Sequence, residues 1–315
     1  MDPRAIPRIF RIEGLIPFTL CAILIGFAVT VWEAGLYGAD WTLFVIAGTA
    51  ALLIHIDGHL WNDIMDREID GQEKSRETGR DRPLVYGWAT VDEYRKMSTV
   101  IVVLVIILAA YLTTQRAWIP VLIGLGFLFD YGYNHPRIAL AHHPFTEWYI
   151  FPWLVVGVTV TVVYAATGIF SPLAFILSML HGLTVTCFVV SMMRRDARSD
   201  RLGGKLTSSV VYPGLPHSTI YGIVTLVMSV LMLYPLTLVL ENRDLAYLLV
   251  LTTALVAGMN TVLGARIDQL STRSQYSLFP DFERDANKLV LQQAGISVVH
   301  AVAISAMILV YGGTV

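Results

Sequence analysis

Apolar stretches recur along almost the whole chain, and short polar segments separate them. A helix that crosses a membrane needs about 20 consecutive, mostly apolar residues. Nine stretches approach that length, and the fourth is the shortest: 14–33, 41–62, 94–114, 117–131, 147–168, 172–194, 217–240, 245–265 and 290–312. The pattern predicts an all-α, multi-pass membrane protein with nine transmembrane helices, folded as one domain over residues 1–315.

Charge is scarce in this chain of 315 residues, of which 15% are charged and 55% are hydrophobic, with a mean hydropathy of +0.62. Charged residues make up roughly a quarter of a typical soluble domain. The low charge and high apolar content of this chain therefore exclude a disordered chain and a coiled coil. A net charge of −2 gives no general attraction to polyanions, which excludes a nucleic-acid-binding surface. The two cysteines, Cys21 and Cys187, lie in apolar stretches and are expected to be small buried hydrophobic residues.

Lysine and arginine are distributed unevenly between the two sides that the nine spans define. Of the 22, all but Arg116 and Arg243 fall at the N-terminus or in the segments that follow spans two, four, six and eight. Cytosolic segments of membrane proteins carry an excess of these residues. The distribution predicts a cytosolic N-terminus, cytosolic cap loops at 63–93 and 195–216, and a C-terminus on the opposite side.

A first group of carboxylates stands where the second span ends. Asp63, Asp66 and Asp70 are spaced three and four residues apart, which places them on one face of a helix. Three like charges on one face repel one another, and a bound divalent cation reverses that repulsion. Mg²⁺ takes oxygen ligands and is commonly held by one or two carboxylates together with substrate phosphates. The alternative is a solvated helix end with ordinary surface acids.

A second group follows the sixth span on the same predicted side, where Asp196 and Asp200 are four residues apart. Two carboxylate groups on two spans can converge on one metal-bound polyanion. Basic residues that can hold phosphate oxygens flank both groups: Arg67, Arg80, Arg82, Arg194, Arg195 and Lys205. Apolar helices beside such a diphosphate site supply a cavity for a hydrocarbon tail. The ligand predicted by this combination is an isoprenoid diphosphate, such as farnesyl or geranylgeranyl diphosphate.

These motifs resemble those of the UbiA superfamily of intramembrane prenyltransferases, over essentially the whole chain. The segment 62–70, NDIMDREID, resembles its NDxxDxxxD motif, residues 80–84 resemble its RxRP loop, and residues 196–207 resemble its second Asp-rich motif. The resemblance implies nine helices around a central cavity. It implies two Mg²⁺ ions bridged by the diphosphate and held by Asn62, Asp63, Asp66, Asp70, Asp196 and Asp200. Arg67, Arg80, Arg82 and Lys205 are the candidates for binding the leaving diphosphate.

The chain departs from the superfamily pattern in two places that concern the acceptor. Residues 11–14 read Arg-Ile-Glu-Gly where many members have Arg/Lys-Pro-x-Asn, and residues 131–137 lack the lysine that many members carry there. Two enzyme interpretations therefore stay open: prenyl transfer to an acceptor, such as a small aromatic molecule, and cyclisation of the isoprenoid without an acceptor. A transporter is a third interpretation, although its charges are expected near mid-membrane and not at one face.

Further candidates lie within or beside the spans. Tyr131 and Tyr133 are predicted to stabilise an allylic carbocation, and the further aromatic candidates for this role are Trp148, Tyr149 and Trp153. Each of these aromatic residues could instead anchor the chain at the membrane interface. His59, four residues after His55, is predicted to act as an acid or base, and the alternatives are hydrogen bonding to neighbouring helices or a two-histidine metal pair. The same ambiguity applies to His181 and Glu147. The polar segment 266–288 is expected to be a cytosolic loop, serving as a lid or as a plain connector.

Overall fold

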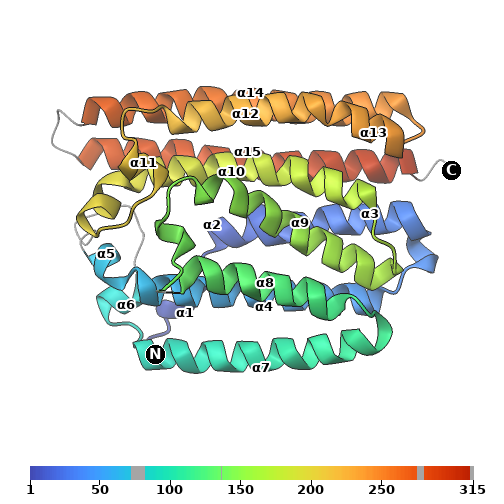
Figure 1. Cartoon of the computed structure of the whole chain (residues 1–315), viewed down its shortest axis with the longest axis horizontal. Coiled ribbons are helices and arrows are strands. Elements are labelled where there is room, and N and C mark those ends of the chain that lie inside the picture. The colour runs from blue at the N-terminus through green and yellow to red at the C-terminus, as the bar shows by residue number, and fades with distance from the viewer. Residues whose placement is uncertain (72–81, 136, 275–279, 313–315) are drawn as a thin grey trace.

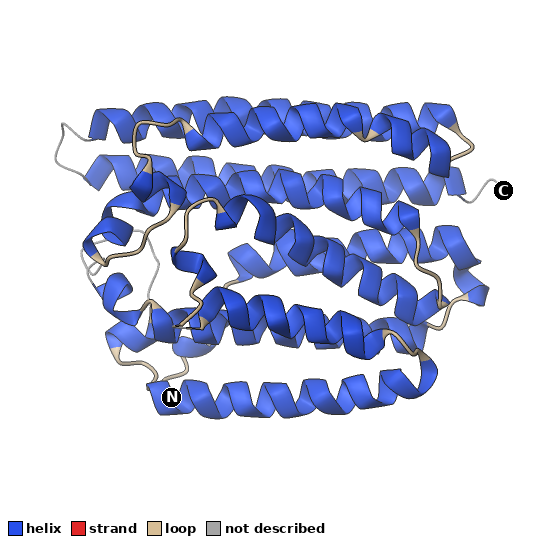
Figure 2. Ribbon diagram, viewed as in Figure 1, coloured by secondary structure: helices blue, strands red, loops and turns tan. Residues whose placement is uncertain are grey.

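The fold is a bundle of long, roughly parallel helices (Figures 1 and 2). The computed structural model describes residues 1–71, 82–135, 137–274 and 280–312, and within these ranges it contains helices and no strand. Eight helices among the described residues are long and apolar enough to cross a membrane. The all-helical, multi-pass membrane fold predicted from the apolar pattern is therefore confirmed.

The elements follow one another along the chain with short connections. In order they are α1 (Ala5–Phe10), α2 (Ile12–Leu15), a π-helical turn η1 (Ile16–Leu20), α3 (Cys21–Gly38), α4 (Trp41–Met65), α5 (Arg67–Gly71), α6 (Pro83–Tyr86), α7 (Val91–Gln115), α8 (Ile119–Asn134), a 3₁₀ turn η2 (Leu140–His142), α9 (Thr146–Thr167), α10 (Pro172–Leu202), α11 (Ser208–Val211), α12 (His217–Leu231), α13 (Leu233–Val239), α14 (Arg243–Ser274) and α15 (Pro280–Gly312).

Local sequence explains where several of these helices begin. The Asp40 side chain accepts a hydrogen bond from the Leu43 amide at 3.0 Å and caps α4. Thr90 and Glu93 form a reciprocal capping box at the start of α7. The Ser171 side chain caps α10, and a proline occupies the first helical position there. Each cap satisfies backbone amides that the helix itself leaves without partners.

Helix α10 is the central element of the bundle, packing against α9, α12, α14 and α15. Almost its whole apolar length is buried inside the protein, whereas α7 and α12 expose most of theirs. The predicted fourth span is α8, which has 16 residues and lies against α4 and α9 (Figure 1). The N-terminus, α5, α6 and α11 lie at one end of the bundle, and α15 ends at the other (Figure 1). This arrangement places both acidic motifs at the same end as the N-terminus.

The polar segment 266–288 differs from the expected loop. Helix α14 continues to Ser274, and α15 begins at Pro280, so most of the segment is helical. Buried Asp268 accounts for part of this extension, since its carboxylate accepts hydrogen bonds from the Thr219 amide at 2.9 Å and from the Thr219 hydroxyl at 2.7 Å. Residues 275–279, which include part of the predicted lid, lie outside the described residues.

Candidate active site

A cavity of about 710 Å³ extends into the bundle from the end that carries the acidic motifs. Its polar end is lined by Arg11, Asn62, Asp66, Asp70, Arg82, Asp196, Asp200 and Lys205. Its inner part is lined by largely apolar side chains, among them Ile54, Leu122, Ile123, Phe151, Val155 and Val160. The cavity thus combines a charged mouth with a hydrocarbon-like interior.

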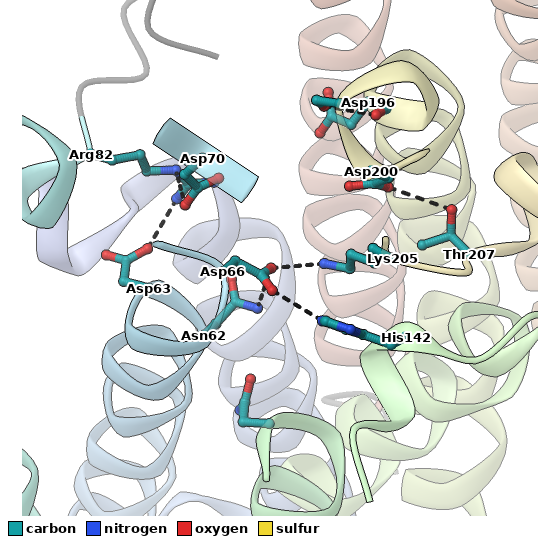
Figure 3. Close-up of polar contacts among 12 residues, drawn as sticks. Asn62, Asp63, Asp66, Asp70, Arg82, His142, Asp196, Asp200, Lys205 and Thr207 are labelled. Carbon is teal, nitrogen blue, oxygen red and sulfur yellow. Dashed lines mark hydrogen bonds and ion pairs between the residues drawn. The ribbon is translucent and has the colours of Figure 1, made fainter. Parts of the chain in front are cut away.

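The first acidic motif is placed by the end of α4 and the short helix α5. Asp66 immediately follows the last residue of α4 and is only 6% exposed. Its carboxylate accepts hydrogen bonds from Lys205 Nζ at 2.8 Å and from Asn62 Nδ2 at 3.2 Å, and it lies 3.2 Å from His142 Nε2 (Figure 3). Asp66 therefore links the first motif to the segment after the second.

Asp63 lies one turn earlier and is held by basic residues. Its carboxylate accepts hydrogen bonds from the Arg11 guanidinium and from Arg82 Nη1 at 3.2 Å, and the Tyr94 hydroxyl lies 3.4 Å away. Arg82 Nε also lies 3.1 Å from the carboxylate of Asp70 (Figure 3). Asp63 is buried and is not among the residues that line the cavity. Arg82 thus joins two acids of the first motif.

The second acidic motif is carried by the last turns of α10. Asp196 accepts two hydrogen bonds from the neighbouring Arg195, at 2.6 and 2.9 Å. The Asp200 carboxylate lies 3.4 Å from the Thr207 hydroxyl, and its backbone carbonyl accepts a hydrogen bond from the Lys205 amide at 2.8 Å. The return of the chain after α10 therefore positions Lys205 between Asp200 and Asp66 (Figure 3).

The charge states at this end follow from burial and from the paired charges. Burial raises the pKa of the Asp66 carboxyl, but Lys205 and the hydrogen bond from His142 outweigh it and hold that pKa well below its usual range. Burial lowers the pKa of Lys205, and the carboxylates of Asp66 and Asp200 outweigh that effect and raise it. Burial raises the pKa of Asp70, an effect that Arg82 opposes. Asp66 and Lys205 are consequently both charged at neutral pH.

A glycine brings the two motifs together. A Cβ atom on Gly203 would lie 2.4 Å from Ile69 Cγ1 and 2.9 Å from Ile69 Cβ, so α5 can approach the end of α10 only because position 203 has no side chain. The next residue, Gly204, has a φ of 76° and turns the chain toward Lys205. The spacing between the acidic groups therefore depends on this contact.

We expect Gly203→Ala to lower the rate of the diphosphate-dependent reaction predicted from the sequence by about tenfold or more, because the added methyl group displaces α5 and the acids beside it. Gly295→Ala in α15 is the matched control, since a Cβ there would meet nothing within 4 Å. The measurement is turnover by each purified variant under identical conditions. Equal rates for both variants would show that the Gly203 contact does not set the geometry of the site.

Some of the other residues predicted for the site line the cavity, and others do not. Tyr133, Trp153, His55 and His59 line the cavity, and His55 Nε2 lies 3.1 Å from His59 Nε2. The remaining aromatic candidates, Tyr131, Trp148 and Tyr149, do not line the cavity, and Tyr131 is 54% exposed. The buried polar candidates Glu147 and His181 do not line it either. Arg67 is exposed and does not line the cavity, and Arg80 lies outside the described residues. Cys21 and Cys187 are buried, as expected.

Arg11 is the main residue at this site that the sequence motifs did not single out. It lies between α1 and α2 with a φ of 41°, an unfavourable conformation for a residue with a side chain. Its guanidinium donates a hydrogen bond to Asn62 Oδ1 at 3.1 Å as well as to Asp63. The sequence signal that could have indicated it is the Arg/Lys-Pro-x-Asn pattern of the resembled superfamily, in which residues 11–14 match the basic first position and lack the proline and the asparagine.

Replacing Arg11 with glycine is expected to raise the KM for the isoprenoid diphosphate predicted from the sequence about tenfold, because hydrogen bonds between charged groups are lost. Glycine accepts the φ of 41°, so the substitution removes the guanidinium without adding backbone strain. Arg4→Gly is a suitable control, since Arg4 is bonded to Asp2 and does not line the cavity. Steady-state kinetics distinguish the two, and an unchanged KM in Arg11→Gly would exclude Arg11 from diphosphate binding.

The side chains at the polar end suit a hard divalent cation. Asn62, Asp66, Asp70, Asp196 and Asp200 line it with oxygen donors only, the ligand type that Mg²⁺ takes. Within the described residues, no three histidine, cysteine or acidic side chains already lie together as a metal-holding group. The acids are instead paired with arginine and lysine, so this donor set fits an ion that also takes ligands from a bound diphosphate.

Comparisons with known proteins agree with the resemblance found in the sequence motifs. A sequence model described as the UbiA prenyltransferase family matches residues 19–282. A UbiA homologue from Archaeoglobus fulgidus, bound to GPP and Mg²⁺, superposes with a TM-score of 0.64 at 15% identity, covering 95% of this chain and 99% of the homologue. An apo UbiA homologue from Aeropyrum pernix K1 gives a TM-score of 0.55 at 16% identity, covering 90% and 97%. Among curated proteins, none matches the chain by sequence.

Proposed function

Because the chain belongs to the UbiA prenyltransferase family, we propose that it ionises an isoprenoid diphosphate within the membrane and transfers the prenyl group to an acceptor. The observation that carries this proposal is the convergence of the two acidic motifs on the polar end of one apolar cavity. A diphosphate head and a hydrocarbon tail are the two parts of a ligand that such a cavity accommodates. The Archaeoglobus homologue has been described with GPP and with DMAPP, each together with Mg²⁺.

The acids are proposed to hold two Mg²⁺ ions, which neutralise the diphosphate as it leaves. The ligands would be the five residues that line the polar end, Asn62, Asp66, Asp70, Asp196 and Asp200. Asp63, the sixth ligand predicted from the sequence, is held by Arg11 and Arg82 outside the cavity lining. Arg11, Arg82 and Lys205 are proposed to bind the diphosphate oxygens directly, since all three line the same end of the cavity. Fixed positive groups directed at a developing negative charge lower the barrier to its formation.

Four aromatic side chains are proposed to surround the allylic carbocation. Phe18, Tyr133, Phe151 and Phe188 line the cavity, and the ring of Phe18 lies 5.5 Å from that of Phe151 and 6.4 Å from that of Phe188. The rings of Tyr133 and Phe151 are 5.6 Å apart. Ring faces attract cations, and an aromatic wall excludes water that would otherwise capture the carbocation.

The polar end of the cavity is proposed to face the cytosol. The N-terminus and the acidic motifs lie at one end of the bundle, and α15 ends at the other (Figure 1). Of the 22 lysines and arginines, all but two belong to the segments assigned to the first end, which is the asymmetry expected of a cytosolic face. The substrate diphosphate would then enter from the cytosolic side and its tail would lie within the membrane.

The proposal is tested by incubating the purified protein with farnesyl or geranylgeranyl diphosphate and Mg²⁺, with and without candidate acceptors. Prenylated acceptor together with Mg²⁺-dependent diphosphate release is the expected result. Release of a cyclic hydrocarbon without acceptor would replace transfer with cyclisation, since both begin with the same ionisation. A transporter would release no diphosphate, so intact substrate throughout would overturn the enzymatic proposal.

A further inference from the structure

A histidine pair on α4 lies in the wall of the cavity, inward from the acidic motifs. His55 and His59 are one helical turn apart, both are partly exposed, and both line the cavity. His55 Nε2 lies 3.1 Å from His59 Nε2. His55 precedes Asn62 by seven residues, which corresponds to roughly 10 Å along a helix. His55 therefore lies beside the first part of a bound isoprenoid tail, inward from its diphosphate.

The π-helical turn η1 brings a hydroxyl group to His55. Thr19 belongs to this turn and lines the cavity, and its Oγ1 is hydrogen-bonded to His55 Nδ1. The turn is held by His181 of α10, whose Nε2 donates a hydrogen bond to the Pro17 carbonyl oxygen at 2.9 Å. The ring of Phe18, one of the four aromatic side chains proposed around the carbocation, lies 6.2 Å from the ring of His55 and nearly perpendicular to it. His55 is thus a neighbour of the proposed carbocation site.

The hydrogen bonds of this group determine which nitrogen keeps a free lone pair. Each neutral imidazole carries one N–H, so one Nε2 of the pair donates and the other accepts. If His55 Nε2 donates, Thr19 donates to His55 Nδ1, and His59 Nδ1 is the one group left without a partner. If His59 Nε2 donates, the Thr19 hydrogen and His59 Nδ1 both lack partners among the described residues. The first arrangement leaves fewer unpaired buried groups, so His55 Nδ1 is an unprotonated acceptor.

A proton added to His55 finds an acceptor at each ring nitrogen. Its Nδ1–H donates to Thr19 Oγ1, and its Nε2–H donates to His59 Nε2. Hydrogen bonds to the charged form of a group stabilise that form. Because Thr19 lines the cavity, its hydroxyl can receive a proton there while its own hydrogen passes to His55 Nδ1. The three side chains are therefore arranged as a proton acceptor in the cavity wall.

We propose that His55 accepts a proton from the prenyl carbocation when no acceptor is bound, so that the enzyme also eliminates diphosphate to give an acyclic conjugated polyene. This inference rests on the proposed function, because it begins with the same ionisation, and it adds a second outcome at the same site. The apolar cavity continues past His55 along α4 to Ala51 and Ala47, which leaves room for an extended tail. An extended tail keeps its distal double bonds away from the carbocation, so the product is acyclic.

The proposed step balances without a co-reactant. The bond between C1 of the isoprenoid and the diphosphate oxygen breaks, and its electron pair leaves with the diphosphate. A C–H bond at C4, or at the methyl group on C3, then breaks, and its electron pair forms the second double bond of a 1,3-diene. The proton passes to Thr19 Oγ1 as the Thr19 hydroxyl proton passes to His55 Nδ1. Loss of this proton to solvent restores the neutral histidine.

The test uses the full-length protein in detergent with farnesyl diphosphate and Mg²⁺ and without an acceptor. Three products are measured in the same reactions: diphosphate, the conjugated polyene, and farnesol, which forms when water captures the carbocation. Thr19→Val removes the hydroxyl at constant size, and His55→Phe removes both nitrogens and keeps a planar ring. Thr161→Val is the matched control, because Thr161 also lines the cavity and donates its hydrogen bond to the Gly157 carbonyl oxygen at 2.6 Å.

The wild type is expected to release the polyene together with diphosphate. Thr19→Val and His55→Phe should each lower the yield of polyene per diphosphate released about tenfold or more, with farnesol in its place, because a positioned base is lost. Thr161→Val should keep the wild-type yield. In a further variant, His55→Ala, added imidazole should restore the polyene, since a free base can occupy the space left by the ring and a purely structural role is not restored in this way.

Diphosphate release with farnesol as the sole organic product of the wild type overturns the inference. Equal polyene yields in His55→Phe and Thr161→Val also overturn it, since the proton would then pass to the leaving diphosphate and not to His55. Both results leave the proposed ionisation intact. Absence of diphosphate release by the wild type overturns the proposed function itself, and the inference with it.

Discussion

Asp66→Asn is expected to lower Mg²⁺-dependent diphosphate release about 100- to 1,000-fold. Asparagine keeps the size of the side chain and loses the charge that pairs with Lys205 at 2.8 Å. Asp66 lies at the junction of the two motifs, so its loss affects both the proposed metal site and the buried lysine. The rate is measured with farnesyl diphosphate at saturating Mg²⁺.

The control for this prediction is Asp92→Asn, because Asp92 lies on α7 with its side chain 82% exposed. This variant removes one carboxylate from the same end of the bundle without touching the cavity. We expect it to retain the wild-type rate. A rate for Asp66→Asn within a few-fold of that of Asp92→Asn would exclude Asp66 from the reaction and count against the first motif as a metal-binding element.

Lys205→Met is expected to lower diphosphate release roughly 100-fold, because a fixed cation directed at the leaving group is lost. The same substitution leaves Asp66 and Asp200 buried without their shared cation, and breaking such a buried pair costs about 3 kcal/mol or more. The protein is therefore expected to melt at a lower temperature in the absence of divalent ions. Added Mg²⁺ should raise the melting temperature of Lys205→Met more than that of the wild type, since the ion replaces the missing charge.

Lys288→Met is the matched control, because Lys288 is exposed on α15 and, among the residues that the structure describes, forms its ion pair with nearby Asp285. Its melting temperature and its response to Mg²⁺ should follow the wild type. Thermal unfolding in detergent, with and without Mg²⁺, provides the measurement. An equal Mg²⁺-induced shift in all three proteins would show that Lys205 and the metal do not neutralise the same carboxylates.

The helical spans and the polar end of the cavity could be predicted from the sequence because their signals are local. A run of apolar residues determines a spanning helix. The spacing of three and four predicted Asp63, Asp66 and Asp70 on one helical face, but α4 ends at Met65 and Asp70 belongs to α5, and of the three only Asp66 and Asp70 line the cavity. The predicted helix boundaries are less accurate in the polar segments between the spans. Helices α14 and α15 extend into the polar segment 266–288, where tertiary contacts such as that of Asp268 with Arg194 at 3.4 Å support residues without an apolar pattern.

The contacts between distant segments could not be predicted from spacing. Arg11 reaches Asp63, 52 residues away, and His142 reaches Asp66, 76 residues away, through the packing of helices whose relative rotation no local pattern specifies. The rotation of α8 within the bundle likewise decides which aromatic candidate reaches the cavity, since Tyr133 lines it and Tyr131 does not.

Both acidic motifs are proposed to bind one metal-bound diphosphate. This is tested by the affinity of a non-ionisable farnesyl diphosphate analogue, with and without Mg²⁺, for the wild type and for Asp66→Asn and Asp200→Asn. We expect Mg²⁺ to strengthen binding to the wild type by about tenfold or more, and either substitution alone to remove this gain. Binding that does not depend on Mg²⁺, or a full Mg²⁺ gain in either variant, would contradict it.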